Sequence, residues 1–447
     1  MSAFKAYDIR GIWGKDIDEE LCYKAGFFLP SLLGADHVLV GRDMRLSSDK
    51  AHDALVEGIT DSGADVWDLG LASTPLVYFA TGNLKADASV QITASHNSAE
   101  YNGLKISKKD VKSVGGGNGL QELERLVNTG TIVKSAEKGK VLDYSSQKEA
   151  YLGFLRPYTE GLEGLDISID CSFGMANLLV KDLLGTSPHY IYDYYDGSFP
   201  AHEPNPLDER NVEDLKKEVL RNGSDCGMMF DGDADRVVFV DEKGRFIQPD
   251  YAIAVLGLYY KKRGRAGIAL QDIRTSRSTT EYLKSLGFEP ATWKVGHAFA
   301  IEKLRELGGV FGGELAGHYY MQDFYWCDSG LLAALLFLSV VSGLKAEGRT
   351  ISSLIDEIVR YENSGEINFK LDQKDEAIAE LCRVYIENSQ PVKVMDFDGY
   401  RIEFDDWWFN VRKSNTEPYL RIVAEAETKE LLSAKLDEIK TIIGRFS

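Results

Sequence analysis

The same order of apolar and polar segments occurs three times along the first part of the chain. Each unit opens with an apolar run that ends in polar or acidic residues: "VLVGRDMR" from Val38, "ISIDCSFGM" from Ile167 and "IALQDIRTS" from Ile268. A helix-compatible stretch follows, and then a second apolar run: "ADVWDLG", "HYIYDYY" or "PATWKVG". A third run then enters an unusual loop, in "SVQITASHN", "CGMMFDGDADR" and "GGVFGGELAGH". This alternation predicts three α/β units.

The position of the three unusual loops is informative. In α/β sheets, ligands gather beyond the carboxyl ends of the strands. We therefore expect the chemistry of the protein to lie around Ser95, Asp231 and Glu314, which follow the third run of each unit.

The pattern changes after Ile351. The segments "INFKLD", "VKVMDFDGYRIEF" and "WWFNVRKSNTEPYLRIVAEA", with a closing helix from Thr428, are typical of antiparallel strands plus helix. The predicted fold class is α/β: three similar α/β domains with mixed, largely parallel sheets, plus a smaller C-terminal α+β domain. Composition shifts place the domains at residues 1–144, 145–245, 246–357 and 358–447.

Composition narrows the range of partners. The net charge is -19 and the chain has no dense Lys/Arg run, which argues against nucleic acid as a binding partner. The five cysteines are scattered and never spaced as C-x-x-C, which favours reduced thiols and a cytoplasmic location. The N-terminal segment "MSAFKAYDIRG" shows no signal-peptide core. The longest apolar run, 330–344, is shorter than the roughly 20 residues that span a bilayer, so we expect a buried helix and no membrane partner.

The segment "DGDADR" carries carboxylates at alternate positions, Asp231, Asp233 and Asp235. Such oxygen ligands suit a hard cation such as Mg²⁺. An EF-hand is rejected, because Arg236 stands where that loop needs glycine and an apolar strand follows. The alternative is an acidic surface turn. The apolar strands on both sides favour a metal site, since three unneutralised carboxylates between them would be costly.

Three interpretations of Ser95 stay open from the residues alone. A hydrolase nucleophile would need the G-x-S-x-G elbow, which is absent, and the adjacent His96 should point away from Ser95 on an extended loop. A turn residue would bond to Asn97. A phosphate carrier would need a metal and cations nearby.

Two further loops offer polar groups. "RKSNTEP" combines the guanidinium of Arg412 with the side chains of Ser414, Asn415 and Thr416, an inventory that suits a phosphate dianion or a hydrated hairpin. In "GELAGH", Glu314 and His318 place a carboxylate and an imidazole in a glycine-flanked loop, and the carboxylate could accept two adjacent sugar hydroxyls.

Taken together and in this order, from "AYDIRG" to "RKSNTEPYLR", these motifs resemble the α-D-phosphohexomutase superfamily, most closely bacterial phosphomannomutase/phosphoglucomutase. The resemblance implies four domains around a central cleft. It implies interconversion of hexose 1-phosphate and hexose 6-phosphate, of mannose and/or glucose, through a phosphoserine and a hexose 1,6-bisphosphate. It also implies Mg²⁺ as cofactor, hexose 1,6-bisphosphate as activator, a sugar-phosphate substrate, and a monomer or dimer.

The resemblance also assigns roles to residues. Ser95 matches the phosphoserine and completes a Mg²⁺ site with Asp231, Asp233 and Asp235. Lys105 and His297 match candidates for proton transfer. The remaining matched catalytic residues are His96 and Arg236. The matched substrate-binding residues are Tyr7, Arg10, Arg274, Glu314, His318, Arg412, Ser414, Asn415 and Thr416.

Some positions depart from the family pattern. Ala316 stands where the sugar loop often has serine, Ala234 where the metal loop often has glycine, and Arg274 where lysine is common; Ser98 and Ala99 replace a frequent proline pair. The sugar preference therefore stays open, with phosphoglucosamine mutase as the nearest alternative. A metal-dependent sugar phosphatase and a non-catalytic sugar-phosphate binding protein are more remote alternatives.

Overall fold

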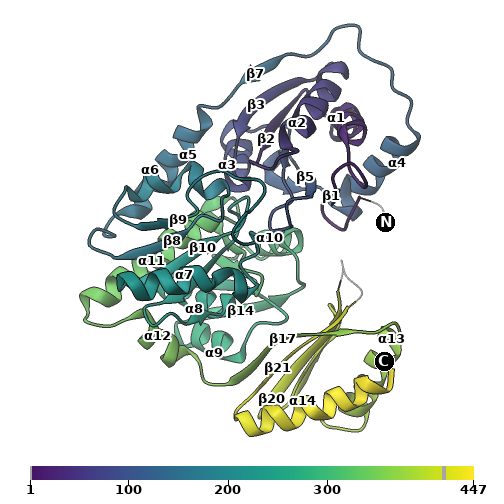
Figure 1. Ribbon diagram of the computed structural model, residues 1–447. Helices are drawn as coiled ribbons and strands as arrows, with labels where there is room; N and C mark the ends of the chain where they lie inside the picture. Colours follow the sequence, from purple (N-terminus) through teal and green to yellow (C-terminus); the bar gives the residue numbers. More distant parts are fainter. Residues whose placement is uncertain (1–2, 415–418, 447) are drawn as a thin grey trace.

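The computed structural model describes residues 3–414 and 419–446. Four sheets follow one another along the chain, and the fourth lies with its two helices at one end of the molecule (Figure 1). The first three sheets are mixed, as predicted, whereas the fourth is antiparallel throughout.

The first sheet has the strand order β1-β5-β4-β2-β3-β7, with β6 paired to β5. Its strands are β1 (Ile9–Ile12), β2 (His37–Arg42), β3 (Asp65–Leu71), β4 (Ala88–Ile92), β5 (Tyr101–Lys108), β6 (Lys112–Ser113) and β7 (Val141–Asp143). The accompanying helices are α1 (Glu19–Leu33), α2 (Ser48–Asp61), α3 (Thr74–Leu84) and α4 (Gln121–Thr129).

The second and third sheets have the orders β12-β11-β10-β8-β9 and β14-β13-β15-β16. The second is built from β8 (Ile167–Asp170), β9 (His189–Ile191), β10 (Cys226–Phe230), β11 (Val237–Asp241) and β12 (Phe246–Ile247), with α5 (Gln147–Leu155), α6 (Val180–Leu184) and α7 (Glu209–Asn222). The third is built from β13 (Gly267–Asp272), β14 (Phe288–Trp293), β15 (Phe311–Gly313) and β16 (Tyr319–Met321), with α8 (Pro249–Lys262), α9 (Arg277–Ser285), α10 (His297–Glu306), α11 (Gly330–Ala346) and α12 (Ile351–Ile358).

The fourth sheet has the order β17-β21-β20-β19-β18. It comprises β17 (Glu362–Lys370), β18 (Lys393–Met395), β19 (Tyr400–Glu403), β20 (Trp407–Lys413) and β21 (Tyr419–Ala426), with α13 (Lys374–Cys382) and α14 (Lys429–Ile443). The side chain of Thr428 caps α14, so the helix begins where the sequence predicted it.

The predicted internal repeat is confirmed. The orders β3-β2-β4-β5, β9-β8-β10-β11 and β14-β13-β15-β16 are the same arrangement, with three parallel strands and an antiparallel fourth. The loop between the third and fourth strand of each repeat is one of the three unusual loops. We call them the serine loop (93–100), the aspartate loop (231–236) and the glutamate loop (314–318).

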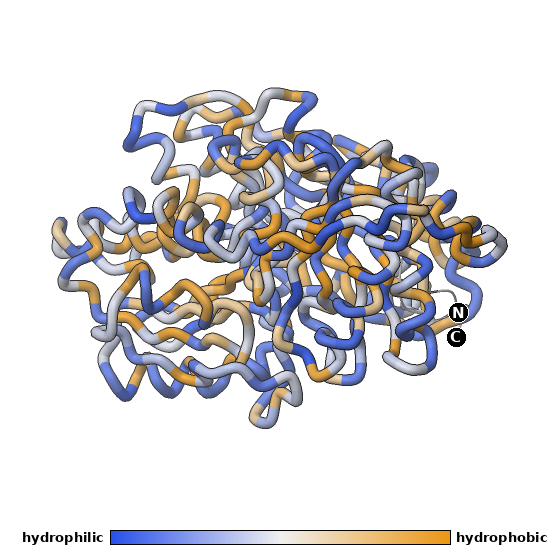
Figure 2. The backbone as a smooth tube through the Cα atoms, turned by 90° about the horizontal axis from the view of Figure 1, so that it is seen from above, coloured by the Kyte–Doolittle hydropathy of each residue, from blue (hydrophilic) through white to orange (hydrophobic). Residues whose placement is uncertain are grey.

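The hydrophobic cores separate the last sheet from the rest. One buried cluster joins side chains of the first three sheets, whereas the fourth sheet and its helices enclose a cluster of their own. Hydrophobic segments run through the middle of the domains, and hydrophilic ones are frequent along their outer loops (Figure 2). Polar side chains can therefore lie between the fourth sheet and the third.

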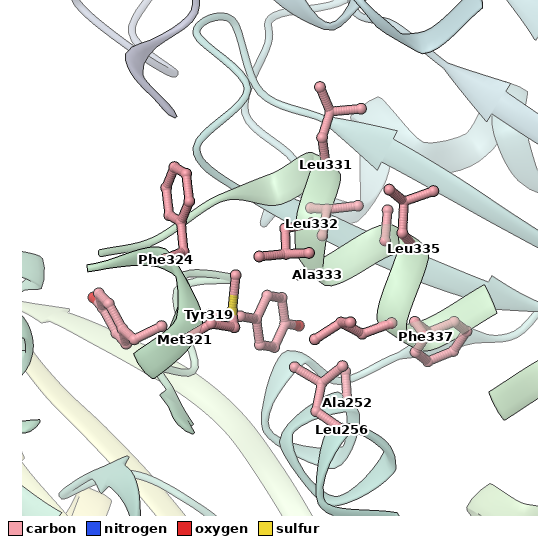
Figure 3. Close-up of a cluster of buried hydrophobic side chains, with 14 of the residues drawn as sticks. Ala252, Leu256, Tyr319, Met321, Phe324, Leu331, Leu332, Ala333, Leu335 and Phe337 are labelled. Carbon is pink, nitrogen blue, oxygen red and sulfur yellow. The ribbon is translucent and has the colours of Figure 1, made fainter. Parts of the chain in front are cut away.

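Helix α11 is the predicted apolar helix and lies within the largest cluster. Figure 3 shows Leu332 and Leu335 of this helix in the same buried cluster as Leu256 of α8 and Met321 of β16. Among the described residues, no single helix combines the length and apolar composition needed to cross a membrane; only α11 and α12, bent by 104° at their junction, pass such a test together.

Candidate active site

The serine loop holds Ser95 fully buried at the carboxyl end of β4. Its hydroxyl donates to Asp231 Oδ2 at 2.7 Å. Ser95 has a φ of 52°, and its Oγ lies 3.3 Å from Nδ1 of His96. The expectation that His96 points away from Ser95 was therefore wrong. The left-handed backbone turns the chain here, whereas the expectation assumed an extended loop.

Arg45 fixes the backbone of the serine loop. The residue is 3% exposed, and its Nη2 donates to the carbonyls of Ser95 at 2.8 Å and Asn97 at 2.6 Å. Nη1 donates to the carbonyls of Ser98 and Tyr101. Four hydrogen bonds from one charged group over-determine the loop conformation, which is how a left-handed residue is held in place.

The aspartate loop approaches the serine loop closely. A Cβ added at Gly232 would lie 2.5 Å from the carbonyl oxygen of Ser95, so a side chain at this position would separate the two loops. Ala234 has a φ of 60°, a conformation that costs a non-glycine residue roughly 1–2 kcal/mol. The absence of a side chain at Gly232 therefore lets the aspartate loop lie directly against Ser95.

The three aspartates converge as predicted. Asp231, Asp233 and Asp235 are fully buried, and they present ligand atoms within 4.8 Å of one another. Lys105 Nζ donates to Asp233 Oδ2 at 2.7 Å and also contacts Asp235 Oδ2. Within the described chain, Asp233 Oδ1 and Asp235 Oδ1 have no hydrogen-bond partner.

Two buried carboxylate oxygens without hydrogen-bond partners fit a hard divalent cation, which would supply the missing contacts. Burial, reinforced by the charges of Asp235 and Asp233, raises the pKa of Asp231 well above its usual value. The carboxylates thus repel one another even with Lys105 beside them. Mg²⁺ on these oxygens would relieve that repulsion.

The glutamate loop lies directly against the aspartate loop. His318 forms an isolated β-bridge with Arg236, and the N–H of Val237 donates to the carbonyl of Gly317. Glu314 accepts a hydrogen bond from the N–H of Gly296 at 2.6 Å. The carboxyl ends of the second and third sheets therefore share one polar region.

Two histidines border this region. The ring centroids of His297 and His318 are 5.9 Å apart, and Nδ1 of His318 lies 2.5 Å from Asp328 Oδ2. Burial lowers the pKa of each histidine to about 4. Both rings are accordingly neutral near pH 7 and can accept a proton or a hydrogen bond.

Tyr7 and Arg10 bring the start of the chain to the same place. The ring of Tyr7 meets His297 edge-on at 5.8 Å between centroids. Arg10 Nη1 donates to Asn97 of the serine loop at 2.9 Å, and its Nη2 pairs with Asp8. The first and third domains thus touch across the site.

The far end of the site is cationic. Arg274, which follows β13, pairs with Asp272 at 2.7 Å and contacts Glu366 of β17 at 3.3 Å. Arg412 Nη2 lies 3.6 Å from the same Glu366 oxygen, and Arg421 Nη1 donates to the other oxygen at 2.8 Å. We call Arg274, Arg412 and Arg421 the arginine cluster.

A chain of contacts links the two ends. The N–H of Leu315, next to Glu314, donates to Asp272 Oδ2 at 2.8 Å, and Asp272 holds Arg274. The structure thus brings together nearly all of the predicted site residues. The N–H of Ser414 donates to the carbonyl of Tyr419 at 2.9 Å. Asn415 and Thr416 lie outside the described residues.

Sequence reasoning missed Arg45, Asp328, Glu366 and Arg421 as functional positions. The repeat offered a signal for Arg45, because Asp43-x-Arg45 matches Asp272-x-Arg274 at the end of the first strand. In both cases the aspartate accepts the N–H two residues later, at 3.0 Å and 2.7 Å. Glu366 and Arg421 carry no such signal, since the two residues that contact each other lie 55 positions apart in the chain. Asp328 lies ten positions from His318, but no motif marks it.

Known proteins resemble this chain along nearly its whole length. Descriptions of phosphoglucomutase/phosphomannomutase alpha/beta/alpha domains I, II and III and of the C-terminal domain match residues 1–131, 149–244, 248–361 and 366–442. A phosphomannomutase of Salmonella montevideo is 34% identical, over 97% of this chain and 98% of its own. Phosphohexose mutases of Xanthomonas campestris are 35% identical over 99% of both chains. A solved phosphoglucomutase/phosphomannomutase family protein from Burkholderia thailandensis superposes with a TM-score of 0.87 at 27% identity, covering 99% of this chain and 96% of that one.

Proposed function

Because the chain belongs to the phosphoglucomutase/phosphomannomutase family and is a phosphohexomutase, we propose that it interconverts the 1- and 6-phosphates of mannose and/or glucose. The carrier of the phosphoryl group is a phosphoserine at Ser95, and the intermediate is a hexose 1,6-bisphosphate. One observation supports this most strongly: the buried Ser95 hydroxyl bonds to one of three buried aspartates, and the other two carry oxygens without hydrogen-bond partners in the described chain.

The reaction is two phosphoryl transfers of opposite direction. In the first, the bond between phosphorus and Ser95 Oγ breaks and a bond from phosphorus to a sugar hydroxyl oxygen forms. The hydroxyl proton goes to a base, and the leaving Ser95 Oγ takes up a proton to become the free hydroxyl. The bisphosphate then turns around, and its other phosphoryl group returns to Ser95. Mg²⁺ held by Asp231, Asp233 and Asp235 would neutralise charge on the transferring group.

The residues of this chain divide the remaining work. Arg45 holds the serine loop so that Oγ stays aligned for both transfers. His297 is neutral near pH 7 and Lys105 is held beside the aspartates, so these two are the candidates for moving the proton. The arginine cluster binds the phosphate that is not reacting.

The four proposed domains each contribute one part of this arrangement. Residues 1–144 supply the phosphoserine, 145–245 the metal ligands, 246–357 the sugar-binding Glu314 and His318, and 358–447 the phosphate-binding Arg412. Closure of the last domain over the substrate would exclude water, which separates a mutase from a sugar phosphatase.

The proposal is tested by a coupled assay with mannose, glucose and glucosamine 1-phosphates, Mg²⁺ and catalytic glucose 1,6-bisphosphate as activator. We expect conversion of mannose or glucose 1-phosphate to the 6-phosphate without release of inorganic phosphate. Conversion of glucosamine 1-phosphate alone would instead identify a phosphoglucosamine mutase. Release of phosphate as the main reaction, or no turnover with any sugar, would contradict the mutase assignment.

A further inference from the structure

Glu366 occupies an unusual position for a carboxylate. Its two oxygens lie within 3.6 Å of three guanidinium groups, those of Arg274, Arg412 and Arg421. Three guanidiniums converging on two oxygens form the arrangement expected around a phosphate group. In this structure the carboxylate of the protein itself takes that place.

The backbone shows how the carboxylate is aimed. The register of β17 against β21 shifts between Asn363 and Glu366, and Gly365 has a φ of 64°. Such a bulge redirects the side chain that follows it. Glu366 therefore comes to the arginine cluster through a local irregularity of the strand.

The guanidiniums of the arginine cluster repel one another, and an anion between them relieves this repulsion. Arg412 and Arg421 stand directly opposite each other on β20 and β21, where like charges destabilise a sheet. Burial, and then the charge of Arg274, lowers the pKa of Arg412, while Glu366 opposes that effect. Arg412 is 5% exposed, and within the described chain its Nε has no hydrogen-bond partner.

The charge balance favours an exchange of anions. Arg274, Arg412 and Arg421 carry three positive charges, and the carboxylates that pair with them in the described chain include Asp272 and Glu366. A phosphate monoester carries about -1.5 to -2 near pH 7. Exchanging the single charge of Glu366 for a phosphate dianion would therefore neutralise more of the arginine charge.

We propose that Glu366 stands in for the substrate's non-reacting phosphate in the empty enzyme and competes with that phosphate for the arginine cluster. The competition weakens the grip. Its catalytic consequence rests on the mutase function proposed above: the bisphosphate must release this phosphate in order to turn around, and Glu366 re-occupies the cluster when it does. Glu366 thus sets the affinity of the phosphate site low enough for reorientation.

The test begins with binding, which needs no turnover. Inorganic phosphate is titrated calorimetrically into the full-length protein without divalent cations, comparing wild type with Glu366→Gln and Glu366→Asp. Removing a competing charged hydrogen-bond acceptor should tighten phosphate binding on the order of tenfold in Glu366→Gln. Glu366→Asp keeps the negative charge but places it one methylene further from the arginines. Its affinity for phosphate should lie between those of wild type and Glu366→Gln.

Three controls keep the result specific. Glu362→Gln removes an exposed carboxylate from the same strand and should leave phosphate affinity unchanged. Adding Arg412→Ala to Glu366→Gln should abolish the gain. Added phosphate should also raise the melting temperature of Glu366→Gln more than that of wild type, because the arginines then regain an anion.

Kinetics then test the catalytic consequence. Glu366→Gln should lower KM and kcat together, because the phosphate is held more tightly and released more slowly. Weaker or unchanged phosphate binding in Glu366→Gln would overturn the inference and make Glu366 a scaffold for the arginines. If Glu366→Gln fails to fold, phosphate binding by Glu366→Asp no tighter than that of wild type overturns it equally. Tighter binding in a protein without mutase turnover would leave the competition intact and refute only the proposed function.

Discussion

The aspartate loop and the arginine cluster both bury charged side chains, but the unmatched charge has opposite sign. In the aspartate loop, three buried carboxylates lie near Lys105, and two of their oxygens have no hydrogen-bond partner in the described chain. In the arginine cluster, three guanidiniums contact Glu366, and Arg274 also pairs with Asp272. We propose that a cation completes the first region and an anion the second.

This difference explains how one site can handle a substrate with two phosphates. The phosphate that is transferred needs a metal, because its charge spreads over the transferring oxygens. The phosphate that is only held needs hydrogen-bond donors of fixed geometry, which guanidiniums provide. Each region suits one of these tasks, and we propose that the sugar binds between them, beside Glu314 and His318.

The largest effect should come from removing the acceptor of the phosphoryl group at the anionic end. Ser95→Ala should lower turnover by at least about 10³-fold, because no other side chain replaces the nucleophile. Intact-mass spectrometry should show a phosphate on wild type and none on the variant. Ser98→Ala, in the same loop, is the matched control and should keep both. A Ser95→Ala protein with more than a few per cent of wild-type turnover would refute the phosphoserine.

The next effect should come from the cation requirement of the same region. Asp233→Ala should lower turnover on the order of 10²-fold or more, because a ligand of the neutralising metal is lost. Titration with Mg²⁺ should show a higher concentration for half-activation, and a chelator should silence wild type reversibly. The exposed Asp182→Ala is the control. Unchanged turnover and Mg²⁺ requirement in Asp233→Ala would show that the loop binds no metal.

At the cationic end, Arg412→Ala should weaken substrate binding by about 1.5–3 kcal/mol, the contribution of a charged hydrogen bond, or about 10- to 150-fold in KM. We also expect a lower kcat and free hexose 1,6-bisphosphate in solution, because closure over the intermediate is less favourable. The control is Arg360→Ala, an exposed arginine outside the cluster. A raised KM without extra released bisphosphate would leave the grip intact but refute closure.

The smallest effect should come from between the two regions. Ala316→Ser adds one hydroxyl near Glu314, and a neutral hydrogen bond of roughly 0.5–1.5 kcal/mol corresponds to about 2- to 12-fold in kcat/KM. The change should differ between mannose and glucose phosphates. Equal changes for both sugars would show that this position does not recognise the sugar.

The sequence predicted the repeat and the residues in its loops because both depend on local pattern. Alternating apolar runs specify the strands, and the parallel arrangement brings their carboxyl ends together. The antiparallel fourth sheet and the helix after Thr428 were predicted for the same reason.

What the sequence could not predict depends on backbone angles and distant partners. The contact between His96 and Ser95 follows from a positive φ at a serine, which pattern does not reveal. The position of Glu366 depends on a bulge in β17 and on Arg274 of another domain. The functional position of Arg45 could have been predicted from the sequence, since the repeat aligns Arg45 with Arg274.

The central claim, that opposite ends of the site hold opposite phosphates, is tested most directly by a crystal structure of Ser95→Ala with glucose 1,6-bisphosphate and Mn²⁺. The account predicts an anomalous peak among Asp231, Asp233 and Asp235, one phosphate beside it, and the other phosphate in contact with Arg412. A metal peak elsewhere, or a bisphosphate with neither phosphate at the arginine cluster, would contradict it.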